Sequence, residues 1–259
     1  MLWNNGPSIG LQRGRRLALA VRLAALYSGG KDSTYAIHHM QQQGHEITTL
    51  VTLYPEQEDS LLFHVPNVRL APIGAEALGL PIITATAPFG EAEELRSLTD
   101  LLRPLSVDGV VIGAIASDFQ HTRIHRVCYD LGLRVFAPLW RKDPKALLRT
   151  YLEAGFQILI VGVYAEGLGE EWLGQRLDPS SVDRLEQLEK TKGVHPAGEG
   201  GEYETFVLDG PCFSKEIRIH EGEKSFHRDS GRYEIRKVEL RPHGSPDSSS
   251  RILHGAARI

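Results

Sequence analysis

Short apolar runs alternate with helix-like patterns along the first half of the chain. Each apolar run is bounded by Gly, Pro or polar residues, and glycine follows three of the helical patterns, as it does at helix ends. The runs that predict strands cover residues 23–27, 47–53, 82–86, 110–115 and 134–137. The patterns that predict helices cover residues 33–43, 68–78, 91–102 and 118–131. This alternation is typical of an α/β domain, and we expect a parallel sheet with helices on both faces.

The pattern changes after residue 137. A helix is predicted over 144–154, an apolar strand over 158–163 and a polar helix around 182–190. Further runs at 202–208, 216–220 and 233–240 predict an antiparallel element. We therefore divide the chain into a leader (1–20), a first domain (21–137), a smaller α+β domain (138–240) and a flexible tail rich in Ser, Gly and Pro (241–259).

Composition narrows the class of protein. The chain has 259 residues, of which 41% are hydrophobic and 24% charged, which is enough to bury a sizeable core. The formal net charge is −4, although the basic residues before position 32 have no acidic counterpart there. This balance argues against general nucleic-acid binding, which depends on clustered Lys and Arg. No apolar stretch approaches the ~18 residues that span a membrane, so we expect no membrane contact.

The two cysteines and the leader indicate the cellular compartment of the protein. Cys128 and Cys212 lie far apart and form no CxxC pair, so neither a disulfide framework nor a zinc ribbon fits. We expect the reducing cytoplasm. The leader resembles a signal peptide only in part, because Arg22 interrupts its apolar run. We expect a disordered leader instead.

The loop after the first expected strand carries the strongest chemical signal. Two glycines allow the backbone to turn tightly and approach an anion, and the following helix adds a positive partial charge at its N-terminus. The hydroxyls can donate to phosphate oxygens, the amine can neutralise charge, and the carboxylate can hold Mg²⁺ directly or through water. The residues concerned are Ser28, Gly29, Gly30, Lys31, Asp32 and Ser33. A plain strand-to-helix turn, with Asp32 or Ser33 as the N-cap, is the simpler interpretation.

These six residues resemble the SGGxDS hallmark of the PP-loop ATP pyrophosphatases. A Walker A loop is excluded, because Asp32 follows Lys31 and Ala25 stands where that motif needs glycine. The resemblance implies an adenine-nucleotide hydrolase-like fold, ATP with Mg²⁺ as cofactors, and cleavage to AMP and pyrophosphate. In that class the loop holds the departing pyrophosphate.

A second unusual segment, residues 197–205, threads three glutamates through three glycines. Such a segment costs conformational entropy and gathers like charge, which favours contact with a cation, a metal or an amine. A solvated acidic turn before a strand is the simpler interpretation. The candidate catalytic residues here are Glu199, Glu202 and Glu204.

The acidic segment also resembles the signature GEGGE[FY]ET of the diphthine–ammonia ligase family. The likeness runs from about Leu23 to Ile219 and includes residues 113–123, 138–140 and 172–174. It implies amidation of diphthine on translation elongation factor 2 by free ammonia, and it extends the nucleotide site to Gly113, Gln120 and Arg123. Many relatives read Gln-Arg-x-Arg where this chain has His121 in place of the first arginine. A homodimer is compatible with the sequence.

Two other functions stay open from the sequence. A PP-loop enzyme of another branch would adenylate a different small molecule or an RNA, although the missing CxxC argues against the best-known thiolase branch. A nucleotide-binding sensor would hold ATP without turning it over. Production of AMP separates the sensor from both enzymes.

The leader generates a first prediction. A truncation that starts at Val21 is expected to keep ATP binding, because the preceding residues show no strand or helix pattern. The measurement is ATP affinity of the truncated and full chains under the same conditions. Weaker binding by the truncated chain would mean that the arginine-rich leader packs against the domain.

Overall fold

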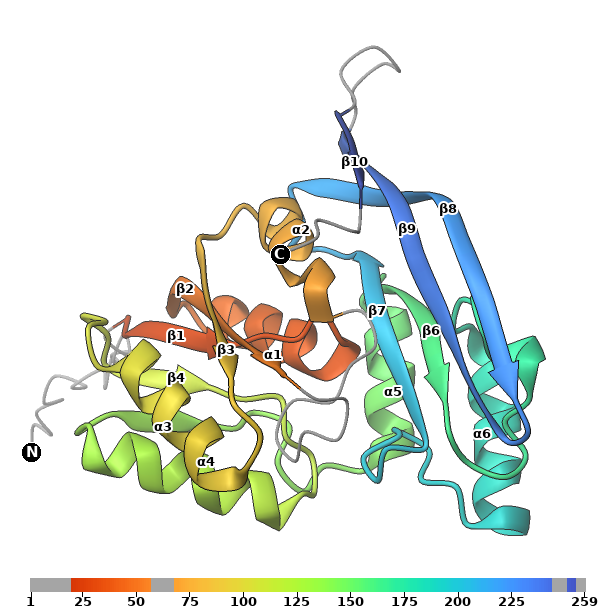
Figure 1. The fold of residues 1–259 in the computed structure, drawn as a ribbon, viewed down its shortest axis with the longest axis horizontal. Helices are drawn as coiled ribbons and strands as arrows, with labels where there is room; N and C mark the ends of the chain where they lie inside the picture. Colours follow the sequence, from red (N-terminus) through yellow and green to blue (C-terminus); the bar gives the residue numbers. More distant parts are fainter. Residues whose placement is uncertain (1–19, 57–67, 244–250, 255–259) are drawn as a thin grey trace, which may run out of the picture.

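The computed structural model describes residues 20–56, 68–243 and 251–254, which form two sheets side by side (Figure 1). Residues 1–19 of the expected leader, and the expected tail apart from 241–243 and 251–254, lie outside the described residues. Within the described part of the chain, no helix is both long and apolar enough to cross a membrane.

The first sheet is parallel throughout and has the strand order β3-β2-β1-β4-β5. Its strands are β1 (Arg22–Leu26), β2 (Glu46–Pro55), β3 (Ile82–Ala87), β4 (Gly109–Val111) and β5 (Arg134–Phe136). Its helices are α1 (Lys31–Gln42), the short η1 (Val68–Leu70), α2 (Ala71–Leu78), α3 (Glu91–Leu102) and α4 (Asp118–Asp130). The expectation of a parallel α/β sheet is confirmed.

Side-chain alternation along β1 explains why helices cover both faces of this sheet. Leu23 and Ala25 belong to a core that includes Ile37 of α1, whereas Ala24 belongs to a second core that includes Leu98 of α3. Successive residues of a strand point to opposite faces, so an apolar run such as that of β1 needs cover on both.

Strand β4 is shorter than its apolar run predicts. The run continues to Ile115, but the ladder ends at Val111; the backbone N–H of Ile112 still donates to the carbonyl of Phe136 at 2.9 Å, and the chain leaves the sheet after it. Gly113 then lies against the start of α1, where a β-carbon would come within 2.6 Å of the backbone nitrogen of Ser33. The missing side chain allows this close approach.

The second sheet contains five strands. They are β6 (Gln157–Val163), β7 (Tyr203–Asp209), β8 (Lys215–His227), β9 (Ser230–Pro242) and β10 (Arg251–His254). All recorded pairings among them are antiparallel. Three helices accompany the sheet: α5 (Pro144–Glu153), η2 (Glu170–Trp172) and α6 (Pro179–Lys192). The expected antiparallel element is confirmed.

Two expectations about this sheet need correction. The hairpin of β8 and β9 is longer than predicted, because its outer residues are polar and exposed and carry no apolar alternation. The tail was expected to be unstructured, but Arg251–His254 pair with Lys237–Leu240 of β9. Both edges of β9 are thus paired, one with β8 and the other with β10 and β6.

One hydrophobic core joins the two sheets. It contains Leu23 of β1 and Ile37 of α1 together with Ile160 of β6 and Phe206 of β7. Helix α5 lies between the sheets in Figure 1, and its buried Tyr151 belongs to the same core. The domain boundary between residues 137 and 138 stays a prediction, but the two parts pack as neighbours on a shared apolar surface.

The strand order fixes where a ligand can bind. The chain passes from β1 to β2 and β3 on one side, and β4 and β5 then lie on the other side of β1. Loops that leave adjacent strands in opposite directions open a crevice at the carboxyl ends of those strands. We therefore expect a ligand-binding site at the carboxyl ends of β1 and β4.

Candidate functional site

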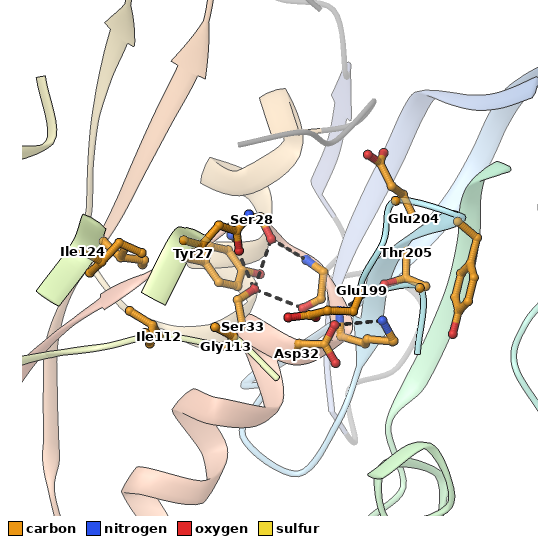
Figure 2. Close-up of a pocket in the computed structure, with 18 residues that line it drawn as sticks. Tyr27, Ser28, Asp32, Ser33, Ile112, Gly113, Ile124, Glu199, Glu204 and Thr205 are labelled. Carbon is orange, nitrogen blue, oxygen red and sulfur yellow. Dashed lines mark hydrogen bonds and ion pairs between the residues drawn. The ribbon is translucent and has the colours of Figure 1, made fainter. Parts of the chain in front are cut away.

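A cavity of about 300 Å³ lies at the carboxyl ends of β1 and β4. Part of its wall comes from the first sheet and part from the segment that leads into β7 (Figure 2). The lining from the first sheet comprises Leu26, Tyr27, Ser28, Gly30, Lys31, Asp32, Ser33, Ile112, Gly113, Ala114, Gln120 and Ile124. The lining from the second part comprises Gly198, Glu199, Gly201, Tyr203, Glu204 and Thr205. The two unusual segments of the sequence thus meet in one cavity.

Glycine is required at the turn between β1 and α1. Gly29 has φ +82°, a left-handed conformation that disfavours side chains, and a β-carbon there would come within 2.7 Å of the Phe206 ring. Gly30 follows as the N-cap of α1 without a capping side chain. The amino end of a twelve-residue helix therefore opens on the cavity, which favours an anion.

The two serines of the loop are held side by side. Their hydroxyl oxygens are 3.2 Å apart, and the backbone N–H of Gly30 donates to Ser28 Oγ at 3.3 Å. Ser33 Oγ donates to the carbonyl of Gly30 at 3.1 Å. Both side chains line the cavity, so two hydroxyls are preset at the same point of its wall.

Lys31 turns toward the second sheet. Its Nζ donates to the carbonyl of Ala197 at 2.6 Å and to Asp32 Oδ2 at 2.8 Å, and only 5% of the side chain is exposed. The ammonium also lies 5.2 Å from the centre of the Tyr203 ring. The charge that was expected to face phosphate is therefore shared with groups of the protein itself.

Asp32 accepts hydrogen bonds on both carboxylate oxygens. Besides the bond from Lys31, the Tyr151 hydroxyl donates to Oδ1 at 2.9 Å. Burial raises the pKa of Asp32, and the positive charge of Lys31 acts in the opposite direction. Tyr151 was missed from the sequence, where its place in an apolar helical pattern reads as core.

The described residues contain no group of three or more His, Cys, Asp or Glu side chains that could hold a metal ion. Asp32 is the expected metal ligand and does line the cavity. Mg²⁺ commonly binds one or two carboxylates together with substrate phosphates, rather than a cage made of protein alone. The position of Asp32 in the cavity, in the loop expected to bind phosphates, fits that mode, and Asp32 as a metal ligand stays a prediction.

Helix α4 brings Gln120 to the cavity but not Arg123. Gln120 lines the wall. The guanidinium of Arg123 instead donates to both carboxylate oxygens of Glu91, at 2.6 and 2.8 Å, and packs 3.3 Å from the centre of the Phe119 ring. Contact of Arg123 with a phosphate stays a prediction, and it would require the guanidinium to leave Glu91.

The three glutamates have different surroundings. One oxygen of Glu199 accepts hydrogen bonds from the backbone N–H groups of Ile115, Ala116 and Ser117, at 3.0, 2.8 and 3.0 Å. Its carboxylate therefore sits at the start of α4, where the helix favours negative charge. This contact fastens the glycine-rich segment of the second part to the loop after β4.

Glu202 is used within its own segment. Its two oxygens accept hydrogen bonds from the backbone N–H groups of His195, at 3.1 Å, and Gly200, at 2.9 Å. Glu202 does not belong to the cavity lining. Its carboxylate closes the turn that it belongs to, and a catalytic role for Glu202 stays a prediction.

Glu204 differs from both. It lines the cavity, and its Oε2 is enclosed by protein without a hydrogen-bond partner. Burial raises the pKa of Glu204 to about 8, although the positive charges of Arg232 and Lys31 act to lower it. In Figure 2 its carboxylate points away from that of Glu199, which lies beside Ser33 and Asp32.

Comparison with known proteins gives matches over most of the chain. Residues 21–135 match the diphthamide synthase N-terminal domain, and residues 143–240 match the diphthamide synthase C-terminal domain. A diphthine–ammonia ligase of Homo sapiens is 36% identical over 230 residues, which cover 80% of this chain and 86% of the human protein. A diphthine–ammonia ligase of Danio rerio is 36% identical over 231 residues, which cover 81% and 90%.

Likeness among solved structures is weaker. A predicted subunit of tRNA methyltransferase from Methanocaldococcus jannaschii aligns with 74% of this chain and 98% of its own, at 16% identity and a TM-score of 0.40. We draw no functional argument from a likeness of this size.

The environment of Glu204 predicts a pH-dependent effect on stability. In the folded protein its pKa is raised to about 8, whereas the unfolded side chain ionises near 4.5. Between these values the folded state holds a proton that the unfolded state has lost, so the free energy of unfolding falls as pH rises. Glu204→Gln removes this loss. We expect the melting temperature of the variant minus that of the wild type to grow from pH 5 to pH 8 and then level off.

Thermal unfolding followed by circular dichroism across that pH range provides the measurement. Glu221→Gln, at an exposed position of β8, controls for the change of residue type. A difference between Glu204→Gln and the wild type that stays constant with pH would contradict the raised pKa.

Proposed function

The chain belongs to the diphthamide synthase family, and from this premise we propose that it is an ATP-dependent amide ligase acting on translation elongation factor 2. The substrate is diphthine, the nitrogen donor is ammonia, and the product is diphthamide. ATP is cleaved to AMP and pyrophosphate. The observation that carries the proposal is the meeting of a phosphate-type loop and an acidic segment in one cavity.

The loop of residues 28–33 suits the phosphates of ATP. The paired serine side chains and the amino end of α1 lie at this point of the wall, and the hydroxyls, which now bond within the loop, can turn toward a phosphate by rotation about the Cβ–Oγ bond. The carboxylate of diphthine attacks the α-phosphorus, and pyrophosphate leaves toward the loop. Asp32 would hold Mg²⁺, and the ion would supply charge neutralisation at the phosphates.

The glycine-rich segment suits the second half of the reaction. Ammonia displaces AMP from the acyl-adenylate, and carboxylates favour the approach of an amine while repelling polyphosphate. We assign Glu199 and Glu202 to positioning, because backbone N–H groups already occupy their oxygens. We assign Glu204 to contact with the reacting groups, ammonia and the acyl-adenylate.

Two further points belong to this proposal. Cys128 and Cys212 are both unpaired thiols with pKa values raised by burial to about 12, which fits a reducing compartment such as the cytoplasm. The cut between residues 137 and 138 separates the part that would bind ATP from the part that would present the amine.

One incubation tests the function as a whole. The full chain is mixed with ATP, Mg²⁺, ammonium and elongation factor 2 carrying diphthine, and the factor is analysed by mass spectrometry while AMP is measured separately. We expect amidation of the factor together with one AMP per amide. AMP without amide would point to a different acceptor, and absence of AMP would leave a nucleotide-binding protein that does not use ATP.

Replacement of Asp32 tests the loop. Asp32→Asn keeps the shape and an acceptor for Tyr151 but removes the charge, so we expect AMP formation to fall on the order of 10²-fold or more with an intact fold. Steady-state AMP production at saturating ATP and Mg²⁺ is the measurement. Asp130→Asn, on the exposed end of α4, is the matched control. Equal AMP production by Asp32→Asn and Asp130→Asn would show that Asp32 has no part in catalysis.

A further inference from the structure

Glu204 lies in a row of residues that crosses three strands. Its register partner on β6 is Gly162, and the partner of Gly162 on β9 is Arg232. Gly162 has no side chain, and the ring of Tyr164 covers it so closely that a β-carbon would come within 2.7 Å of the Tyr164 hydroxyl. Glu204 lines the cavity, and the positive charges of Arg232 and Lys31 act on its carboxylate.

An enclosed carboxylate oxygen without a hydrogen-bond donor is uncommon and costly. Leaving a buried polar atom unpaired lowers stability, and more so when the group is charged. In Glu204 this applies to Oε2, whereas backbone N–H groups serve the carboxylates of Glu199 and Glu202. Glu204 is therefore the glutamate of this segment that lines the cavity and keeps an acceptor oxygen without a hydrogen-bond partner.

The groups that take part in the reaction differ in how well they would bind to the carboxylate of Glu204. Polyphosphate is repelled by a carboxylate. A trimethylammonium group has no N–H bond, so it can neither donate to the carboxylate nor give up a proton. Mg²⁺ commonly binds a carboxylate together with substrate phosphates, and the phosphates are expected at the loop of residues 28–33, where Asp32 lies. Ammonium is small and cationic, carries N–H donors and can lose a proton.

We propose that Glu204 binds ammonium in the cavity and accepts its proton, so that ammonia is released beside the acyl-adenylate. The inference rests on the proposed function. The nitrogen lone pair freed in this way attacks the acyl carbon, the carbon–nitrogen bond forms, and the carbon–oxygen bond to the phosphate of AMP breaks. One proton of ammonium remains on Glu204, and a second leaves the amide nitrogen for the AMP phosphate or water. Atoms and charge balance without any further reactant.

The properties of Glu204 fit a proton acceptor. A carboxyl group whose pKa is raised to about 8 takes up a proton more readily near neutral pH than an ordinary glutamate. The arrival of a cation offsets the cost of ionising a buried carboxyl, so ammonium itself favours the form of Glu204 that can accept the proton.

A change of nucleophile separates this step from the formation of the adenylate. Hydroxylamine is uncharged at neutral pH, so it can attack the acyl-adenylate without first losing a proton, and it yields a hydroxamate. In Glu204→Gln we expect the amide formed from ammonium to fall by about 10²-fold or more, with kcat/KM for ammonium carrying the loss. Hydroxamate formation and KM for ATP are expected to stay close to the wild-type values.

The experiment measures both products on elongation factor 2 by mass spectrometry, with the full chain, ATP and Mg²⁺. Glu221→Gln, exposed on β8, is the control for loss of a glutamate and is expected to form both products at wild-type rates. Amide formation at the wild-type rate by Glu204→Gln would overturn the inference, and so would an equal loss of amide and hydroxamate. If the wild type forms neither product, the proposed function itself fails and the inference with it.

Discussion

Two hydrogen bonds between the loop after β1 and strand β7 hold the site together. The backbone N–H of Val207 donates to the carbonyl of Gly29 at 2.9 Å, and the backbone N–H of Lys31 donates to Thr205 Oγ1 at 3.1 Å. Buried backbone groups are almost always paired, so these bonds cannot be lost without cost. Because β7 continues directly from the glycine-rich segment, the loop and the glutamates reach the same cavity through one strand.

The cavity carries more carboxylates than cations, and its electrostatics follow from that excess. Asp32 and Lys31 form a pair, and the negative charge of Glu199 also raises the pKa of Asp32. A nucleotide would add further negative charge. The amino ends of α1 and α4 partly offset the carboxylates, which explains why the helix starts and the acidic side chains are found at the same edge.

The parts of the fold that could be predicted are those with strong local patterns. The strands and helices of the first sheet follow from apolar runs and from glycines, and α3 matches its predicted range in full. Strands β8 and β9 extend beyond their apolar residues, since pairing with each other, rather than burial, maintains the ladder there. The start of α6 was predicted late because its first turn is polar and is fixed by the cap at Asp178.

The candidate site also contains residues that could be predicted from local patterns and contacts that could not. The loop of residues 28–33 could be predicted because a tight turn needs particular residue types at particular positions, whereas Gly113 was expected only from the resemblance to the family. The contact between Tyr151 and Asp32 could not, since it joins residues 119 positions apart and leaves no local pattern. The hydrogen bond between Arg123 and Glu91 could not be predicted for the same reason. It holds the guanidinium of Arg123 away from the cavity in this conformation.

The glycine-rich segment shows how one acidic motif supports several tasks. Gly198 and Gly201 adopt positive φ angles of 69° and 84°, and the resulting turn directs Glu199 and Glu202 onto backbone N–H groups. Glu204 comes after the turn, on β7, so strand pairing and not the turn decides where it points. Its position therefore depends on β6 and β9, while the turn closes the cavity around it. The three glutamates of this segment are in this way divided into two whose carboxylates accept hydrogen bonds from backbone N–H groups, Glu199 and Glu202, and one, Glu204, whose Oε2 has no hydrogen-bond partner.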